Sequence, residues 1–312
     1  MEKLIGRFAP SPSGRMHLGN VYAALLSYLC AKSRQGLWLL RIEDLDPLRC
    51  PRSYADLIKE DLRWLGLTWD NEEVVYQSER GAIYKKYAEL LRQKDLTYPC
   101  FCSRAELHAA EAPHASDGRP VYAGTCRNLT QAEVTDKLLL RAPALRVKVP
   151  WEERTFQDDF YGTYKFNLGR DWGDFLIQRS DGVWAYQLAV TVDDALMGVN
   201  QVVRGRDLLT SSPVQMYLQQ QLGFPTPRYL HVPLLLAPGG ARLAKRDQAA
   251  DLGYLRRLWP FPEQLLGRLG CLMGQLPHPE PVSLAELTAG FDLSLLPKED
   301  LTVGPELVTA EP

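Results

Sequence analysis

A short turn rich in proline, serine and glycine carries the first residues that could do chemistry. Residues 10–14 connect an expected strand to an expected helix, and His17, Gly19 and Asn20 stand where that helix begins. Helix N-termini bind phosphate because their backbone N–H groups are unpaired and the helix dipole is positive there. His17 adds a donor, and Gly19 lets a nucleotide approach where a Cβ would clash. The pattern indicates a polyphosphate site, although a tight turn with a solvent-facing histidine is the simpler interpretation of these residues alone.

A basic segment late in the chain could close on the same polyphosphate. Residues 242–246 read Arg-Leu-Ala-Lys-Arg and follow a Pro-Gly-Gly tether at 238–240. A flexible loop that ends in adjacent cations, here Lys245 and Arg246, can stabilise the charge that develops during adenylyl transfer. Alone, such a segment is usually a solvated basic turn. Together with the first turn, in this order along the chain, it predicts chemistry on ATP.

Charged residues at the ends of three expected strands could recognise an amino acid. Glu43 follows the strand 37–42 and can bind an ammonium at the sheet's carboxyl edge, where open α/β sheets bind ligands. An acidic side chain would need a guanidinium, because arginine binds carboxylates with two hydrogen bonds and stays charged. Arg7 and Arg204 are the candidates, and either could instead form a structural ion pair. The acidic turn could also be solvated, which is our expectation for Asp46.

Three cysteines predict a zinc site. Cys100, Cys102 and Cys126 cluster in a stretch that proline, glycine and cysteine make irregular. Zinc prefers four tetrahedral ligands, and close thiols in a cytosolic chain suit it better than disulfides do. His108 and His114 are the ordinary candidates for a fourth ligand. Three thiols without metal in an irregular insert are the alternative.

The elements that must position these residues alternate between strand and helix. Strands are expected at 4–8 and 37–42, and helices at 21–31 and 53–65, with Ser53 as the N-cap of the second helix. This order predicts a parallel sheet with crossover helices. After the irregular insert we expect the alternation to resume through 184–189, a strand at 201–204, a helix at 208–222, a strand-like run at 229–236 and helices as far as Met273.

Composition limits the possible functions. The chain has 312 residues, 46% hydrophobic and 24% charged, which suits two or three folded units. Its net charge of −2 excludes a protein that is basic all over, so a nucleic acid would need a local patch. We expect part of it near Arg242, Arg246, Arg256 and Arg257, although a solvated helix face fits nearly as well. No apolar run reaches the roughly 20 residues of a membrane span and no signal peptide is visible, so we expect a cytoplasmic protein.

The two polyphosphate-binding segments resemble the HIGH and KMSKS signatures of class I aminoacyl-tRNA synthetases. His17-Leu18-Gly19-Asn20 corresponds to the first signature. Leu243-Ala244-Lys245-Arg246 corresponds to the second, with Ala244 in place of the usual serine. Lys245 matches the lysine that this family aligns with ATP.

The acidic turn narrows the resemblance to one branch of that class. Residues 41–47, Arg-Ile-Glu-Asp-Leu-Asp-Pro, resemble the RIEDxD motif of glutamyl-tRNA synthetases. Glutaminyl enzymes carry Asp and Asn in place of Glu43 and Asp46. Leu45 stands where the full-length glutamyl enzymes usually have threonine. The sequence of residues 41–47 is most similar to that of their truncated relatives, the glutamyl-queuosine tRNA(Asp) synthetases.

The resemblance implies particular site residues. The glutamate pocket would be Arg7, Phe8, Ala9, Pro10, Ser11, Glu43, Tyr186 and Arg204. ATP would contact His17, Gly19, Asn20, Lys245 and Arg246, with His17 and Lys245 catalytic. The segment Tyr122-Ala123-Gly124-Thr125-Cys126-Arg127 resembles the family's Y-x-G-T-C-R, in which tyrosine completes the zinc site, so the implied ligands are Cys100, Cys102, Tyr122 and Cys126.

The implied fold is α/β, a Rossmann-type parallel-sheet class I catalytic core with an inserted zinc-bearing module and a short helical C-terminal region. Few residues follow Arg246, so no anticodon-binding domain is expected. The implied units are the first half of the core at 1–97, the insert at 98–150, the second half of the core at 151–237 and the C-terminal region with the KMSKS-like loop at 238–312.

The implied reaction is a tRNA modification. A cytoplasmic, monomeric ligase with one structural zinc would activate L-glutamate with ATP, and with Mg²⁺ bound to the ATP, to glutamyl-adenylate without tRNA. It would then transfer the glutamate to queuosine in the anticodon loop of tRNA(Asp). One alternative is the core of a conventional glutamyl-tRNA synthetase that charges the tRNA 3′ end. Another is a non-catalytic zinc-bearing tRNA-binding module, against which the intact site residues argue.

Overall fold

A parallel sheet lies at the centre of the computed structural model, which describes residues 3–103, 106, 121–237, 240, 251–304 and 307. Strands β1 (Ile5–Phe8), β2 (Leu37–Ile42) and β3 (Val75–Tyr76) pair in parallel in that order. Strand β9 (Gln201–Gly205) lies beside β1, where the Asn200 N–H donates to the Ile5 carbonyl at 3.0 Å. Strand β10 (Arg228–Val232) pairs in parallel with β9. The expected α/β fold with a parallel sheet is therefore confirmed.

Two crossover helices link the first strands, as the periodicity predicts. Helix α1 (Leu18–Lys32) connects β1 to β2 and is buried along most of its surface. Helix α2 (Arg52–Trp64) connects β2 to β3 and begins with Pro51 at the N-cap position, so the expectation of Ser53 there is wrong. Proline suits a helix start because the N–H it lacks would have no partner in the helix. The 3-10 turn η1 (Gln77–Glu79) and helix α3 (Gly81–Gln93) follow.

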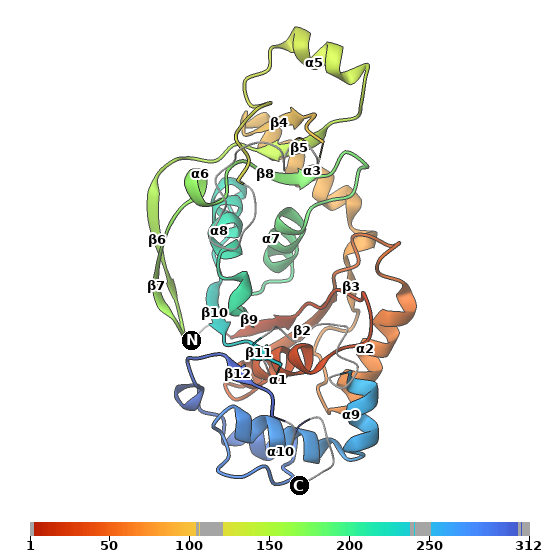
Figure 1. The fold of residues 1–312 in the computed structure, drawn as a ribbon, viewed down its shortest axis with the longest axis vertical. Coiled ribbons are helices and arrows are strands. Elements are labelled where there is room, and N and C mark those ends of the chain that lie inside the picture. The colour runs from red at the N-terminus through yellow and green to blue at the C-terminus, as the bar shows by residue number, and fades with distance from the viewer. Residues whose placement is uncertain are drawn as a thin grey trace.

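A second, antiparallel sheet stands apart from the first, at the top of Figure 1. Its strands pair in the order β4 (Thr97–Cys100), β5 (Ala144–Val147) and β8 (Phe175–Gln178). Helix α5 (Gln131–Leu138) projects from it, and a capping box of Thr130 and Glu133 starts this helix. That Thr-x-x-Glu pattern is readable in the sequence, although we expected no regular element there.

The remaining central elements join the two sheets. Strands β6 (Glu153–Asp158) and β7 (Gly162–Asn167) form a hairpin along one side, and β6 pairs with β10. Short helix α6 (Leu168–Asp171) follows it. Helices α7 (Tyr186–Leu196) and α8 (Ser211–Leu222) lie between the sheets (Figure 1). Helix α8 begins three residues later than predicted, because the 3-10 turn η2 (Arg206–Leu208) precedes it.

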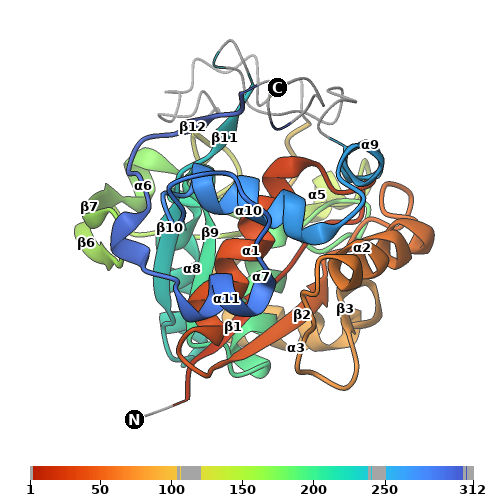
Figure 2. The same ribbon diagram turned by 90° about the horizontal axis from the view of Figure 1, so that it is seen from below.

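The C-terminal elements pack against the first helix. Pro233 separates β10 from β11 (Leu235–Leu236), so the run expected at 229–236 is two strands. In Figure 2, α10 and α11 lie across α1, and Leu265, Leu269 and Met273 share one hydrophobic core with Leu25 of α1. None of the helices in the described ranges is long and apolar enough to cross a membrane. The elements of this region are α9 (Leu252–Leu258), α10 (Pro262–Leu272), α11 (Leu284–Ala289), η4 (Leu293–Leu295) and β12 (Leu301–Thr302), which pairs with β11.

Candidate active site and metal centre

One cavity of about 690 Å³ opens between the carboxyl ends of β1 and β9 and the start of α1. Lys245 and Arg246 lie outside the described residues, so the structure says nothing of their place. All the other residues predicted for glutamate or ATP line this cavity, although their segments are far apart in sequence. They are Arg7, Phe8, Ala9, Pro10, Ser11, His17, Gly19, Asn20, Glu43, Tyr186 and Arg204.

His17 caps the helix that faces the cavity. Its Nδ1 accepts a hydrogen bond from the Gly19 N–H at 3.1 Å, and Asn20 Oδ1 accepts from the His17 N–H at 3.3 Å. A neutral imidazole whose Nδ1 accepts carries its proton on Nε2, which is then a donor. A Cβ at position 19 would come within 3.0 Å of the His17 ring. Gly19 therefore has a structural role that the sequence did not suggest, which is to make room for the histidine.

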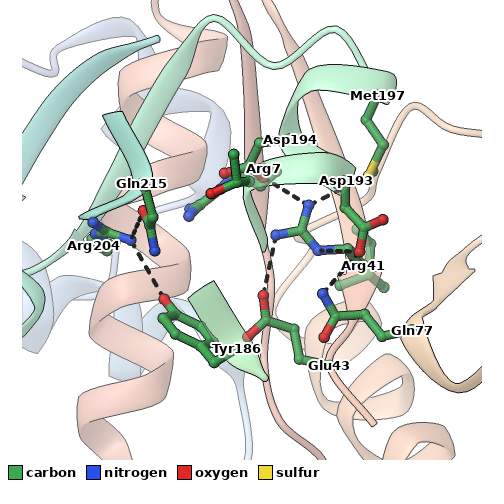
Figure 3. Close-up of polar contacts among 12 residues, drawn as sticks. Arg7, Arg41, Glu43, Gln77, Tyr186, Asp193, Asp194, Met197, Arg204 and Gln215 are labelled. Carbon is green, nitrogen blue, oxygen red and sulfur yellow. Dashed lines mark hydrogen bonds and ion pairs between the residues drawn. The ribbon is translucent and has the colours of Figure 1, made fainter. Parts of the chain in front are cut away.

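A fully buried arginine, Arg41, organises the floor of the site (Figure 3). Its Nη1 lies 2.7 Å from Asp194 Oδ1 and its Nη2 lies 3.1 Å from Glu43 Oε1. Burial opposes the charge of Arg41, but Asp194, Glu43 and Asp193 outweigh that effect and raise its pKa. The guanidinium is therefore a permanent cation beneath the cavity, and it fixes the position of the Glu43 carboxylate.

Two consecutive carboxylates on α7 complete this network. Asp194 also binds Arg7, whose Nε lies 3.3 Å from its Oδ1, while Arg7 Nη1 donates to the Val203 carbonyl at 3.2 Å. Asp193 has a separate set of partners, shown in part in Figure 3. They are Gln77 Nε2 at 2.8 Å, Arg80 Nε at 2.6 Å and Tyr84 Oη at 2.7 Å. Arg7 thus has an ion pair in the protein, as one of our two interpretations expected.

The acidic turn after β2 is fixed rather than solvated. The Glu43 N–H donates to the Pro10 carbonyl at 2.9 Å, which joins this turn to the first one. Burial raises the pKa of Glu43, although Arg41 and Arg7 oppose the shift. Asp46, which we expected to be solvated, pairs with Arg179 at 3.1 Å. The expectation for Asp46 is wrong because the turn that follows β8 reaches this edge of the sheet.

Arg204 differs from Arg7 and Arg41 because its partners are neutral. It is 5% exposed, and within the described ranges no carboxylate lies within 4.0 Å of its guanidinium. Behind it, away from the cavity, it donates to three buried acceptors at short distances, namely His231 Nε2 at 3.1 Å, Gln215 Oε1 at 2.9 Å and Ser212 Oγ at 2.8 Å.

The cavity side of Arg204 is more loosely bonded. Nη1 lies 3.4 Å from the Tyr186 hydroxyl and Nη2 lies 3.4 Å from the Leu208 carbonyl, and both of these residues line the cavity. Burial raises the pKa of Tyr186, which keeps the hydroxyl protonated. Each terminal nitrogen therefore has one N–H that can exchange its long hydrogen bond for one to a ligand in the cavity. Two such N–H groups side by side are the geometry that binds a carboxylate with two hydrogen bonds.

The predicted metal ligands converge at the tip of β4. The Sγ atoms of Cys100, Cys102 and Cys126 all lie within 4.8 Å of one another. The Tyr122 hydroxyl lies 3.5 Å from Cys100 Sγ and 3.7 Å from Cys102 Sγ, and Cys102 Sγ lies 3.6 Å from Cys126 Sγ. Around a tetrahedral zinc, ligand sulfurs are about 3.8 Å apart and sulfur and oxygen about 3.5 Å apart. The four side chains therefore fit such an ion. His108 and His114 lie outside the described residues.

A buried arginine that the sequence did not bring to notice supports this cluster. Arg146 Nε lies 3.2 Å from Cys100 Sγ, and its guanidinium lies 3.7 Å from the centre of the Tyr122 ring. Burial alone would raise the pKa of the Cys100 thiol, but hydrogen bonding with Tyr122 and Arg146 and the charge of Arg146 outweigh burial and lower this pKa. A thiolate, which is the form that binds metal, is thus favoured at Cys100.

Comparison with known proteins identifies the family of this chain. Residues 3–295 match the family described as tRNA synthetases class I (E and Q), catalytic domain. A glutamyl-Q tRNA(Asp) synthetase of Symbiobacterium thermophilum is 46% identical, over 98% of both chains. The chain belongs to the glutamyl-Q tRNA(Asp) synthetase family. A second member, from Nitratidesulfovibrio vulgaris, is 42% identical over 97% of this chain and 96% of its own.

Solved structures place this family member among the class I ligases. The crystal structure of a glutamate tRNA ligase from Elizabethkingia meningosepticum in complex with its amino acid superimposes with a TM-score of 0.81. Its sequence is 28% identical, and the match covers 98% of this chain and 68% of that one. The predicted class of enzyme, a ligase of the class I synthetase type, is therefore confirmed.

Within this synthetase, the basic patch expected for tRNA remains a prediction. Arg256 forms ion pairs with Glu60 at 2.8 Å and Asp61 at 3.1 Å, and its guanidinium lies over the ring of Trp64. These contacts tie α9 to α2, so they explain Arg256 without a nucleic acid. Arg242 and Arg246 lie outside the described residues.

We predict that Arg41→Met will lower the free energy of unfolding by about 3–5 kcal/mol, because it leaves buried carboxylates without their cation. Denaturant unfolding followed by circular dichroism measures the change. Arg92→Met is the matched control, since Arg92 forms an exposed ion pair with Glu89 on α3 and its loss should cost nothing measurable. Equally small losses in both variants would contradict the central role given to Arg41.

Proposed function

We propose that the chain activates L-glutamate with ATP and transfers it to queuosine in the anticodon loop of tRNA(Asp). The observation that carries the choice of amino acid is Arg204, a buried guanidinium with neutral partners and two loosely bonded N–H groups toward the cavity. A cation that is removed from water without a counter-charge is costly, and a ligand carboxylate supplies that charge. An acidic amino acid therefore completes the site.

The other pocket residues have complementary roles in this proposal. Glu43 accepts from the substrate ammonium, and Arg7 and Arg204 bind its two carboxylates. The Tyr186 hydroxyl lies beside Arg204 and donates to a carboxylate oxygen. Phe8, Ala9, Pro10 and Ser11 form the cavity wall between β1 and α1.

ATP would occupy the part of the cavity next to α1. In this proposal His17 Nε2 donates to the phosphates, and Gly19 and Asn20 at the start of α1 lie beside them, while the Gly19 N–H stays bonded to His17 Nδ1. Lys245 and Arg246 would close on the phosphates. Mg²⁺ would accompany the ATP. A carboxylate oxygen of glutamate attacks the α-phosphorus and pyrophosphate leaves, a step that needs positioning and charge stabilisation more than a protein base. This adenylation is proposed to proceed without tRNA.

In the second step, a hydroxyl of the queuosine cyclopentenediol attacks the carbonyl carbon of the adenylate. An ester forms, AMP leaves and the hydroxyl proton is lost to solvent. The names of the relatives support this acceptor, since proteins 42–46% identical over nearly their whole length are glutamyl-Q tRNA(Asp) synthetases. Charging of the tRNA 3′ end is the alternative, favoured by the structural likeness to a glutamate tRNA ligase at 28% identity.

We further propose that Cys100, Cys102, Tyr122 and Cys126 hold one structural zinc. The metal would join the two ends of the segment between β4 and α5, and the bridge between Tyr122 and Gly173 would link it to the rest of the fold. The division of the chain at residues 97, 150 and 237, the cytoplasmic location and the monomeric state also remain proposals.

Glutamate should support exchange of pyrophosphate into ATP, and glutamine should be at least ~10-fold poorer in kcat/KM, because a neutral amide leaves a buried guanidinium unpaired. Arg204→Gln should remove most of this preference. The matched control is Arg206→Gln, two residues along the chain, where the arginine pairs with Asp300 and does not line the cavity. Equal activation of both amino acids by the unmodified protein would refute the pocket.

Freshly purified protein should contain about one zinc per chain by elemental analysis. Cys100→Ser and Cys126→Ser should each lose the metal and lower Tm, because a structural site contributes its binding energy to folding. Cys271→Ser should keep the metal, since this cysteine lies far along the chain on α10. Protein prepared without chelators that contains no metal would rule out the site.

Labelled glutamate should attach to tRNA(Asp) that carries queuosine and not to the same tRNA with guanosine at that position. Nuclease mapping locates the label, and we expect it on the anticodon fragment. Label on the 3′-terminal adenosine of tRNA(Glu) would instead support the conventional synthetase.

A further inference from the structure

His231 is a buried histidine behind the proposed substrate pocket. It lies on β10, is 0% exposed and does not line the cavity. Its Nε2 is 3.1 Å from Arg204 Nε and 3.2 Å from Ser212 Oγ, and its Nδ1 is 2.7 Å from Asp158 Oδ2. The imidazole therefore stands between the substrate-facing arginine and a buried carboxylate.

We propose that His231 is a positioning residue, which holds Arg204 in the one orientation that presents two N–H groups to the substrate carboxylate. This inference rests on the proposed glutamate site. Arg204 has five N–H groups, and three of them are held from behind by His231, Gln215 and Ser212. Among these three bonds, the one to His231 is made by Nε. Because Nε joins the guanidinium to the rest of the side chain, this bond fixes the orientation of the guanidinium plane.

The hydrogen-bond pattern requires one tautomer of a neutral ring. Arg204 Nε–H can only donate, so His231 Nε2 must accept and the ring proton must sit on Nδ1, where it donates to Asp158. Asp158 is kept ionised by further donors, the backbone N–H groups of Phe160 at 3.0 Å and Tyr161 at 2.8 Å. The carboxylate thus selects the tautomer, and the tautomer provides the acceptor that Arg204 needs.

Protonation of His231 would break this arrangement, because two N–H donors would then face each other and two cations would be adjacent. The charged or titratable groups around the ring are Asp158 on β6, Arg204 on β9, Asp207 in η2 and Tyr229 on its own strand. Burial, together with the charge of Arg204, lowers the pKa of His231 in spite of Asp158. The ring is therefore neutral near pH 7 and able to accept.

Two substitutions separate positioning from simple packing. His231→Asn keeps a donor at the place of Nδ1, toward Asp158, and removes the acceptor at the place of Nε2. His231→Gln keeps an acceptor near the place of Nε2, toward Arg204. Tyr229→Phe is the packing control, since it removes a hydroxyl bonded to Gln219 and leaves the ring stacked on His231.

The measurement is glutamate-dependent pyrophosphate exchange, with separate KM values for glutamate and ATP. We expect His231→Asn to raise the glutamate KM about 10-fold or more, the effect of losing a hydrogen bond to a charged group, with the ATP KM nearly unchanged. His231→Gln should stay within about 3-fold of the unmodified protein, and Tyr229→Phe should leave both KM values unchanged even where its Tm is lower.

The pH profile gives a second readout. As pH falls through the pKa of His231, the glutamate KM of the unmodified protein should rise, and this rise should be absent in His231→Gln. Equal KM values for glutamate in His231→Asn and the unmodified protein, or the same acid rise in His231→Gln, would overturn the inference. If His231→Asn does not fold, the comparison of pH profiles decides alone. Failure of the unmodified protein to use glutamate would instead refute the proposed function.

Discussion

Arg41 carries a positive charge at a place that water cannot reach, and much of the site follows from that constraint. An unpaired ion in the interior is strongly unfavourable, so carboxylates must surround it. Asp194 and Glu43 do so directly, and Asp193 lies 3.9 Å from its Nε. These partners come from the end of β2 and from α7, so one charge fixes the helix, the strand end and the acidic turn relative to one another.

The contrast between two buried arginines gives the site its selectivity in our proposal. Arg41 is balanced by the protein and is closed to ligands, whereas Arg204 is held by neutral acceptors and has its weaker bonds toward the cavity. The difference lies in which groups accept the hydrogen bonds, because both side chains are almost completely buried. A protein can thus use the same residue type once as a structural support and once as a receptor for a missing charge.

Local signals predicted more of the elements than of the contacts. Helix α1, strands β1 and β2 and the first turn, which is rich in proline and serine, could be read from periodicity and turn residues. The residues that face the cavity were found because motifs place them at strand ends, where a parallel sheet brings distant segments together. The roles of Arg41, Asp193, Arg146 and His231 could not be predicted in this way, since they depend on partners from other elements. Arg41 opens the motif at residues 41–47 and interrupts the apolar run of β2, but neither sign reveals which carboxylates surround it.

Because helices α10 and α11 share a hydrophobic core with α1, they are part of the same folded unit as the catalytic-domain sheet. The helix that carries His17 at its start loses its apolar cover if these elements separate from it. Amide hydrogens in α1 and α10 should then exchange with solvent through the same opening event, as members of one cooperative unit. Proteases that cut near the C-terminal helices would for that reason disturb the part of the cavity next to α1, although no residue of α10 or α11 lines it.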